Sequence, residues 1–230
     1  MIRGEKKIFA FFGPPGSGKG TLAGKCLREA GIPVLSTGNL CRQHVEAQTE
    51  FGRQFQSSLA EGKLIPDTLI TEMVIDWIKS AAIKSPTLIL DGFPRTKAQA
   101  ILLQDFLLKA HQEFILIPVV FDITDTVLVS RLTNRYVCSN TACQLPYSEA
   151  CPPVKQGVCD QCSSNLAKRA DDTSAIAMQR ITTYREHAEE VVSYFKQKNA
   201  ALLTLFCDDK SPAELFEAFY ALAAGQVLSQ

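Results

Sequence analysis

The sequence predicts an α/β domain in which a parallel sheet of five strands lies between helices. Short, nearly continuous runs of Ile, Leu, Val and Phe alternate with longer segments of helical periodicity, which is the order expected of β–α–β units. A glycine-rich turn follows the first apolar run and opens the first helical segment. The 230 residues are enough to bury a sizeable core, so we expect one domain that carries insertions.

The predicted strands are the five apolar runs. Few polar residues interrupt them, as is usual for strands that are buried on both faces of a parallel sheet. They lie at residues 7–12, 33–35, 87–90, 117–121 and 202–206. Since parallel neighbours need a crossover connection, we expect helices on both faces of the sheet.

The predicted helices fill the segments between these strands. They lie at residues 18–30, 67–82, 96–110, 125–135, 173–199 and 212–223. Four of them have a residue suited to an N-cap at or near the start, namely Asp67, Thr96, Asp125 and Ser211.

Two segments interrupt the alternation. Residues 36–66 contain no strong strand and are punctuated by glycines, which favours short helices. Residues 136–168 are rich in Cys, Pro, Ser, Asn and Gln and have no helical periodicity. We interpret both as insertions into a single domain that spans residues 1–230.

The charge balance argues against polyanionic partners. Lys plus Arg and Asp plus Glu both total 24, so the net charge is zero and gives no general attraction to nucleic acid or membranes. No apolar run approaches the roughly 20 residues that span a bilayer. The run at residues 8–12 is also shorter than the ~7–15 apolar residues of a secretory signal. We therefore expect a cytoplasmic protein.

Residues 13–21 form a phosphate-binding motif, with the sequence Gly-Pro-Pro-Gly-Ser-Gly-Lys-Gly-Thr between a strand and a helix. The glycines let backbone N–H groups surround an anion, and the helix N-terminus adds partial positive charge. Lys19 can neutralise β- and γ-phosphate oxygens, and the Thr21 hydroxyl can approach Mg²⁺. Gly20 stands where Ser or Thr usually follows the lysine. The motif predicts a nucleoside triphosphate site, although ATPases, GTPases and kinases all share it; a glycine turn without a ligand is the less favoured interpretation.

A second motif lies at the end of the third predicted strand and begins at Asp91. A carboxylate in this position can hold Mg²⁺ through water. Gly92 lets the backbone approach a ligand closely, and Arg95 offers a two-pronged donor suited to phosphate. Because ligands of such sheets bind at the carboxyl ends of the strands, we expect these residues to face a site.

Five of the eight cysteines fall between residues 138 and 162. Cys138-x₄-Cys143 and Cys159-x₂-Cys162 can bring four thiolates to one tetrahedral ion, and zinc is the usual occupant, with iron as an alternative. Cys151 lies between the pairs and is an alternative ligand. A closed site of this kind stabilises the fold and takes no part in chemistry. A redox disulfide or an incidental cluster is less favoured.

Further motifs follow the phosphate loop in a fixed order. They are Ser36-Thr37-Gly38 with Arg42, Gly62-Lys63-Leu64-Ile65-Pro66-Asp67, Asp91-Gly92-Phe93-Pro94-Arg95-Thr96 with Gln99, and Arg169 with Asp171-Asp172. With these motifs the chain resembles the adenylate kinase family over essentially its whole length, in the long form with a zinc-bearing lid. The resemblance implies the phosphate-loop nucleoside monophosphate kinase fold with two inserted mobile subdomains. It also implies a monomer that transfers a phosphoryl group reversibly from Mg·ATP to AMP, giving two ADP.

The resemblance also implies the roles of individual residues. The segment 36–66 is the insertion that closes over AMP, and 136–168 is the lid over ATP. ATP-binding positions are Gly16, Ser17, Gly18, Lys19, Gly20, Thr21, Arg135, Pro146, Tyr147 and Ser211. AMP-binding positions are Thr37, Arg42, Lys63, Leu64, Ile65, Gly92, Phe93, Pro94, Arg95 and Gln99, joined by Arg169 and Arg180. The residues expected to act on the transferred phosphoryl group are Lys19, Arg95, Arg135, Arg169 and Arg180.

The expected chemistry agrees with this set of residues. Phosphoryl transfer needs in-line placement and stabilisation of charge on the phosphoryl oxygens, with little covalent help from the protein. Several cations and Mg²⁺, held near Asp91 and Thr21, do this once closure has excluded water. Two mobile insertions around a phosphate loop therefore favour a kinase over an ATPase.

The chain departs from the family pattern at several positions. Asn39 stands where the family usually has Asp, Tyr136 where it often has Arg, and Ser148 where it frequently has His. Residues 173–175 replace acids that often follow the paired aspartates. None of these changes removes a predicted phosphate contact.

Three other interpretations differ from an adenylate kinase that uses ATP. UMP/CMP kinases are similar, but they tend to have Ala in place of Thr37, Asn in place of Gln99, and a short lid without cysteines. GTP is an open alternative as the donor. A zinc-ribbon NTPase that binds nucleic acid is disfavoured, since residues 136–168 carry only Lys155 and Lys168 as cations.

Overall fold

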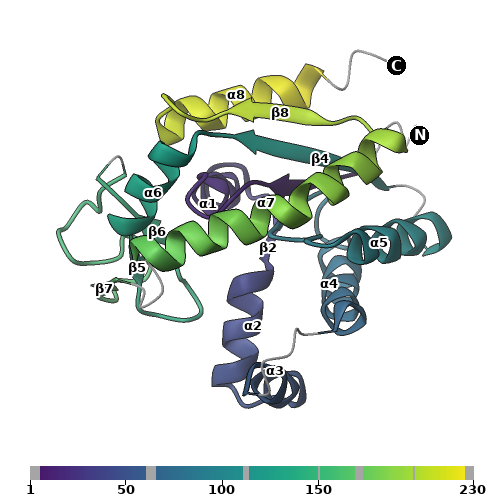
Figure 1. Ribbon diagram of the computed structural model, residues 1–230, viewed down its shortest axis with the longest axis horizontal. Coiled ribbons are helices and arrows are strands. Elements are labelled where there is room, and N and C mark those ends of the chain that lie inside the picture. Colours follow the sequence, from purple (N-terminus) through teal and green to yellow (C-terminus); the bar gives the residue numbers. More distant parts are fainter. Residues whose placement is uncertain are drawn as a thin grey trace.

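The computed structural model describes residues 6–60, 66–110, 114–149, 151–168, 173–198 and 200–225. Its main sheet has five parallel strands (Figure 1). In spatial order they are β2 (Val34–Ser36), β3 (Thr87–Asp91), β1 (Lys6–Phe12), β4 (Phe114–Asp122) and β8 (Leu203–Phe206). The prediction of a five-stranded parallel sheet is confirmed.

The helices of the described residues follow the predicted alternation. They are α1 (Lys19–Ala30), α2 (Thr37–Glu46), α3 (Glu50–Ala60), α4 (Asp67–Ala81), α5 (Lys97–Ala110), α6 (Asp125–Thr133), α7 (Ser174–Gln197) and α8 (Pro212–Gly225). Each of the six helices predicted outside the insertions forms, with its ends within about two residues of the expected positions.

Two of the four predicted N-caps are wrong. Asp67 and Asp125 are the first residues of their helices, and Pro66 and Thr124 precede them as caps. The other two are confirmed. The Thr96 hydroxyl accepts from the backbone N–H of Gln99 at 3.2 Å, and the Ser211 hydroxyl accepts from the backbone N–H of Glu214 at 3.3 Å. The two aspartates are not caps because their carboxylates contact side chains on other helices.

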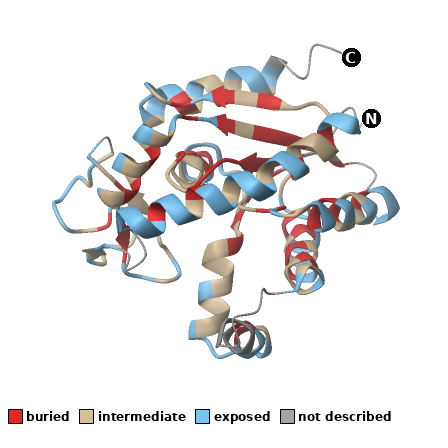
Figure 2. Cartoon of the chain, in the orientation of Figure 1, coloured by how far each residue is buried: buried red, intermediate tan, exposed pale blue. Residues whose placement is uncertain are grey.

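The central strand β1 shows how the layers form. Its alternate side chains point to opposite faces. Phe9 and Phe11 pack in a cluster that includes residues of α1 and α8, whereas Ile8, Ala10 and Phe12 pack in clusters that include residues of α4, α5 and α7. Figure 2 shows the strands as the most buried part of the chain, with exposed residues on the outer sides of the helices. The sheet is therefore covered on both faces, as predicted.

Two smaller parts extend from the sheet. Helices α2 and α3 project beyond the edge next to β2 (Figure 1). On another side lies a three-stranded antiparallel sheet in the order β6-β5-β7, made of β5 (Tyr136–Cys138), β6 (Pro146–Tyr147) and β7 (Leu166–Ala167). Strands this short leave no periodicity in a sequence, so the sequence of the cysteine-rich segment gave no sign of them.

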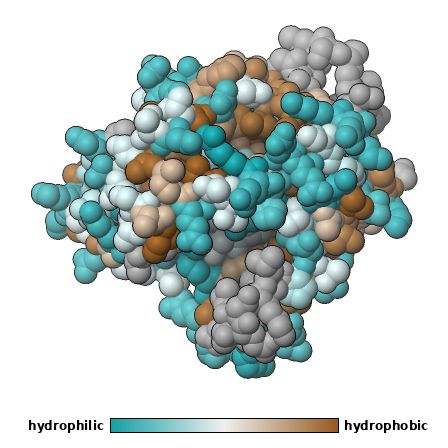
Figure 3. All heavy atoms as spheres, viewed as in Figure 1, coloured by the Kyte–Doolittle hydropathy of each residue, from teal (hydrophilic) through white to brown (hydrophobic). Residues whose placement is uncertain are grey.

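Charged and polar side chains cover much of the surface. Figure 3 shows hydrophilic residues gathered along the face that α7 crosses, between smaller hydrophobic patches. None of the helices in the described ranges is both long enough and apolar enough to cross a membrane.

Candidate active site

A cavity of about 950 Å³ opens at the carboxyl ends of the central strands. Its walls come from the phosphate loop, the turn after β3, helices α2, α6 and α7, the cysteine-rich segment and the start of α8. The strand order changes sense at β1: β2 and β3 lie on one side of this strand, and β4 and β8 lie on the other. Such a switch point, at the carboxyl ends of parallel strands, is where sheets of this class bind ligands.

The phosphate loop has the backbone geometry that anion binding requires. Gly16 has φ of 86° and Gly18 has φ of 95°, in the left-handed region that favours glycine. A side chain on Gly16 would also lie 2.9 Å from the Cγ atom of Leu132. The loop turns directly into α1, so backbone N–H groups at the helix N-terminus border the cavity.

Lys19 is folded back onto this loop. Its Nζ donates to the backbone oxygen of Gly13, to that of Pro14 at 2.9 Å and to the buried Ser17 hydroxyl at 3.2 Å. Carbonyl oxygens therefore hold the ammonium group at the place where the loop could receive phosphate oxygens.

The charges around Lys19 come from several parts of the chain. Burial lowers the pKa of Lys19 to about 8, and the Asp91 carboxylate partly opposes this effect. The guanidinium groups of Arg95, Arg135 and Arg180 lower the pKa further. The fold thus brings together a lysine, three arginines and one carboxylate, a set that suits a ligand with several negative charges.

Asp91 lies beside the phosphate loop. It is the last residue of β3 and pairs with Phe11, one residue before the end of β1. A Cβ built on Gly20 would lie 3.5 Å from the Asp91 Oδ2 atom, and Thr21 lines the same cavity. A carboxylate and a hydroxyl next to a phosphate loop are oxygen donors that fit Mg²⁺.

The turn after β3 is held together by Gly92. The Thr37 hydroxyl and the Arg95 Nε atom both donate to the Gly92 carbonyl oxygen at 2.9 Å. Gly92 has φ of 81°, and a Cβ there would lie 3.1 Å from Arg95 Nη2 and 3.2 Å from the Thr37 hydroxyl. A side chain at this position would therefore crowd both predicted ligand contacts.

Arg42 and Arg95 border the same glycine. A Cβ on Gly38 would lie 3.6 Å from Arg42 Nη1 and 3.9 Å from Arg95 Nη2. Arg42 also donates to the side-chain oxygen of Asn39. Two guanidinium groups thus line one part of the cavity wall, in an arrangement that can hold a second phosphate.

The residues predicted to bind ATP or AMP divide into three groups. Those that line the cavity are Gly16, Gly18, Lys19, Gly20, Thr21, Arg42, Gly92, Pro94, Arg95, Arg135, Pro146, Tyr147 and Arg180. Those in the adjoining structure, outside the lining, are Ser17, Thr37, Phe93, Gln99 and Ser211. Lys63, Leu64, Ile65 and Arg169 lie outside the described residues.

Sequence reasoning missed Arg131, which lines the cavity on α6. Its Nη2 atom donates to the carbonyl oxygen of Cys207 at 2.9 Å and to that of Asp208 at 3.3 Å. These bonds fix the guanidinium group against the segment that joins β8 to α8. The one signal in the sequence was its spacing of four residues before Arg135 near the end of a predicted helix.

One face of α7 was also missed. Gln179, Thr183, Tyr184 and His187 line the cavity together with the predicted Arg180. They recur at intervals of three to four residues, so they share a helix face. This periodicity was visible in the sequence and could have identified the face once Arg180 was assigned.

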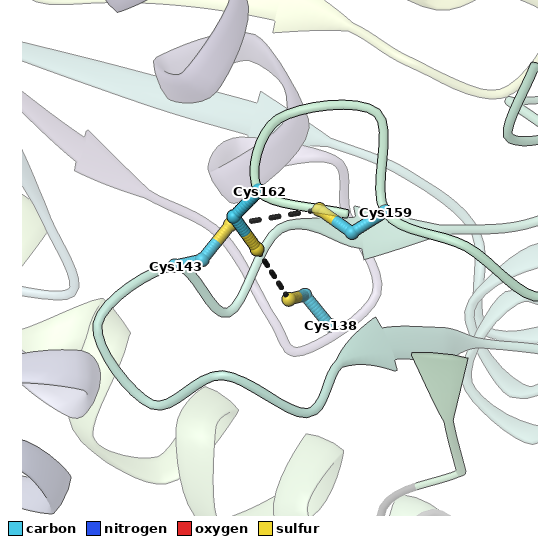
Figure 4. A group of neighbouring side chains, drawn as sticks. All are labelled: Cys138, Cys143, Cys159 and Cys162. Atoms are coloured by element: carbon cyan, nitrogen blue, oxygen red, sulfur yellow. Dashed lines mark hydrogen bonds between the residues drawn. The ribbon is translucent and has the colours of Figure 1, made fainter. Parts of the chain in front are cut away.

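The four predicted metal ligands lie together in the cysteine-rich segment, with their side chains pointing toward one another (Figure 4). The Sγ atoms of Cys138 and Cys162 are 3.3 Å apart, those of Cys143 and Cys159 are 3.7 Å apart, and all four lie within 4.8 Å of one another. Tetrahedral Zn–S bonds of about 2.3 Å need sulfur separations of about 3.8 Å. The four thiols therefore fit a zinc ion.

Cys151 and Tyr147 have other surroundings. Cys151 pairs with Ser148 in an isolated β-bridge and is not part of the four-cysteine group. The Tyr147 hydroxyl donates to the Sγ of Cys159 at 3.4 Å and accepts from the backbone N–H of Asp160 at 2.7 Å. Tyr147 therefore contacts the cysteine cluster and also lines the cavity.

Known proteins resemble this chain over most of its length. The family model described as adenylate kinase matches residues 11–200. The adenylate kinase of Treponema pallidum (strain Nichols) is 39% identical over 191 residues, which cover 83% of this chain and 86% of that protein. The adenylate kinase of Chlamydia felis (strain Fe/C-56) is 36% identical over 220 residues, covering 94% and 97%. That of Clostridium tetani (strain Massachusetts / E88) is 34% identical over 206 residues, covering 89% and 93%.

Proposed function

Because this chain belongs to the adenylate kinase family and so transfers the terminal phosphoryl group of ATP to AMP, we propose that it does so with the residues that converge on Lys19. The observation that carries the proposal is the convergence of three arginines and Asp91 on this lysine. They come from three separate segments: Asp91 and Arg95 from the end of β3 and the turn after it, Arg135 from just after α6, and Arg180 from α7.

The donor lies, in this proposal, on the phosphate loop. The backbone N–H groups of residues 16–21 and the Lys19 ammonium group bind the β- and γ-phosphates. Binding requires Lys19 to exchange its contacts with Gly13 and Pro14 for phosphate oxygens. Arg135 faces the same phosphates, and Arg131 borders the adenosine beside the segment before α8.

The acceptor lies on the opposite side of the cavity. Arg42 and Arg95 both border Gly38, so their two guanidinium groups can bind the single phosphate of AMP together. Because position 92 is a glycine, no side chain crowds Thr37 or Arg95, and the backbone of the turn after β3 can approach AMP closely. Gln99 stands behind this turn and is proposed to contact the base.

Phosphoryl transfer then depends on how the two substrates are aligned and on how the charge of the transferred group is stabilised. The acceptor oxygen attacks the γ-phosphorus in line as the bond to the β-phosphate oxygen breaks, and the equatorial oxygens carry negative charge throughout. Arg95 and Arg180 both lie close enough to Lys19 to lower its pKa, so the three cations can stabilise the phosphoryl oxygens together. Mg²⁺ that arrives with ATP neutralises phosphate oxygens, and Asp91 and Thr21 are the residues that would hold it through water.

The two smaller parts of the fold are proposed to be the closing elements. The segment 36–66 would close over AMP and the segment 136–168 over ATP. Closure excludes water, so the phosphoryl group is transferred to AMP and is not hydrolysed.

The four cysteines of the second segment would hold structural zinc. The ion would cross-link this segment and take no part in the reaction. Free thiols persist in a reducing compartment, so we propose that the protein is cytoplasmic. We also propose that it is a monomer.

The test compares how one substitution changes the KM for AMP and the KM for ATP. Arg95→Ala should raise the KM for AMP by about ten- to a hundredfold, as expected for a lost charge-assisted hydrogen bond, and leave the KM for ATP within about twofold. Lys97→Ala is the matched control, since it removes an exposed cation two residues away that does not line the cavity. A selective rise in the KM for ATP would reverse the assignment of the two sites.

A further inference from the structure

The buried amide of Gln99 is held from both ends. Its Oε1 atom accepts from the backbone N–H of Arg95 at 2.7 Å. Its Nε2 atom donates to the Oδ1 atom of Asp67, also at 2.7 Å. Gln99 is 6% exposed, so water competes little with either bond. The side chain therefore has a fixed position behind the turn after β3.

The two carboxylate oxygens of Asp67 contact different residues, Gln99 on α5 and Thr96 just before that helix. While Oδ1 accepts from Gln99, Oδ2 accepts from the Thr96 hydroxyl at 2.8 Å. The Thr96 hydroxyl in turn accepts from the backbone N–H of Gln99 at 3.2 Å. Asp67 is the first residue of α4, about thirty residues earlier in the chain. One carboxylate thus joins the start of α4 to the N-cap of α5.

These contacts permit one orientation of the amide. An ionised carboxylate only accepts hydrogen bonds, and a backbone N–H only donates. If the amide were rotated by half a turn, its NH₂ group would face the Arg95 N–H and its oxygen would face Asp67, so both bonds would be lost. After the two protein bonds are made, the amide still has one N–H and one oxygen lone pair for a ligand.

A fixed amide can discriminate between purines. Adenine presents a donor at its 6-amino group beside a ring-nitrogen acceptor, and an amide binds such a pair with its oxygen and its N–H together. Guanine presents an acceptor at the 6 position, so it needs the amide oxygen and nitrogen interchanged or loses a bond. An amide free to rotate would accommodate both bases, whereas one that is locked would favour a single base.

We propose that Asp67 is a positioning residue that locks Gln99 in the orientation complementary to adenine and so sets the preference for AMP over GMP. The inference rests on the proposed function, in which Gln99 contacts the acceptor base. A simpler role for Asp67 would be to stabilise the N-terminus of α4 by its negative charge. The two roles predict different effects of an uncharged residue that can still accept a hydrogen bond.

The experiment measures kcat/KM for AMP and for GMP, with saturating Mg·ATP, in the full-length protein and four variants. These are Asp67→Ala, Asp67→Asn, Gln99→Ala and the Asp67→Ala/Gln99→Ala double variant. Asp67→Ala should reduce the AMP-to-GMP ratio by about tenfold or more, the size of discrimination expected of one paired base contact, with the KM for ATP within about twofold of wild type. Asp67→Asn should keep most of the ratio, because its amide oxygen can still accept from Gln99 and its NH₂ can donate to Thr96.

The double variant separates positioning from stability. If Asp67 acts through Gln99, the double variant should have the same ratio as Gln99→Ala alone. Additive losses, an unchanged ratio in Asp67→Ala, or an Asp67→Asn variant as impaired as Asp67→Ala would overturn the inference. Should Asp67→Ala fold poorly, Asp67→Ser replaces it, since the shorter hydroxyl cannot reach the Gln99 amide.

Failure of the proposed function would be recognised separately. It would appear in the wild-type protein as a lack of AMP-dependent transfer, before any variant is compared. A wild-type protein that phosphorylates AMP, together with a Gln99→Ala variant of unchanged AMP-to-GMP ratio, would instead refute the role of Gln99 and this inference with it.

Discussion

The Nε2 atom of Gln43 on α2 donates to the backbone oxygen of Thr141, 3.4 Å away in the cysteine-rich segment. The two residues are 98 positions apart in the chain. Gln43 and Ala142, next to Thr141, both line the cavity. The contact therefore joins the two predicted insertions across the opening of the site, and closing one of them is expected to favour closing the other.

Gln43→Ala should raise the KM for AMP and the KM for ATP together. The variant loses one neutral hydrogen bond between the insertions, which corresponds to about a two- to tenfold effect. Steady-state kinetics with each substrate varied in turn provide the measurement. Gln54→Ala, an exposed glutamine on α3 of the same insertion, is the control and should change neither value. A change in only one KM would show that the contact does not couple the two sites.

ATP binding should take up a proton above pH 8. The pKa of Lys19 is lowered to about 8 by burial and by Arg95, Arg135 and Arg180, against the opposing effect of Asp91. Phosphate oxygens stabilise the ammonium form, so binding raises this pKa and the affinity for ATP should fall as the pH rises above about 8. Titration calorimetry at pH 7.5 and 9, in buffers of different ionisation enthalpy, measures the uptake.

The same pKa has a consequence for stability. The folded-state pKa of Lys19 lies below its ordinary value of 10.5, so between about pH 8 and 10.5 the unfolded chain binds more protons. The contribution of Lys19 to the free energy of unfolding should therefore rise with pH across this window. Lys19→Arg is the control for both effects, since arginine stays charged; equal proton uptake in this variant would assign the uptake to another group.

Cys159→Ser should remove the metal and lower the melting temperature. Three thiolates are a poorer zinc site than four, and metal binding contributes directly to folding. We expect a loss of roughly 5 °C or more, the equivalent of about 2 kcal/mol in a chain of this length. Elemental analysis and calorimetry on the same samples test this. Cys151→Ser is the matched control and should keep both metal and melting temperature; the reverse result would make Cys151 a ligand.

Arg131→Ala should weaken ATP binding alone. The guanidinium group is held against the Cys207 and Asp208 carbonyl oxygens at the edge of the cavity, on the side of the proposed adenosine site. We expect the KM for ATP to rise about tenfold and the KM for AMP to change little. Arg185→Ala breaks an exposed ion pair between α7 and Asp125 of α6, outside the cavity lining, and should change neither value. An equal effect on both substrates would contradict the assignment.

Much of the fold could be predicted because the local signals are strong. The strand at residues 7–12 and the phosphate loop that follows it were identified from composition and spacing, and both form as expected. The pairing of Cys138 and Cys143 with Cys159 and Cys162 was likewise predictable, because each pair is close in sequence and the segment between is short.

The missed features depend on contacts between distant segments. Arg131 borders the cavity because the chain returns to it 76 residues later at Cys207. Asp67 was expected to cap its helix, but its carboxylate is used by Thr96 and Gln99, which only the packing of α4 against α5 brings near. The small sheet of the cysteine-rich segment has strands too short to be recognised.

The most direct measurement is a coupled assay of phosphoryl transfer from Mg·ATP to AMP, UMP, CMP and GMP in parallel, with ATP alone as the control. Rapid turnover with AMP, slow turnover with the other monophosphates and no ATP hydrolysis in the control are the expected results. Preference for UMP or CMP would contradict the roles of Thr37 and Gln99 in the acceptor site. Hydrolysis of ATP at the same rate without any acceptor would contradict the account as a whole.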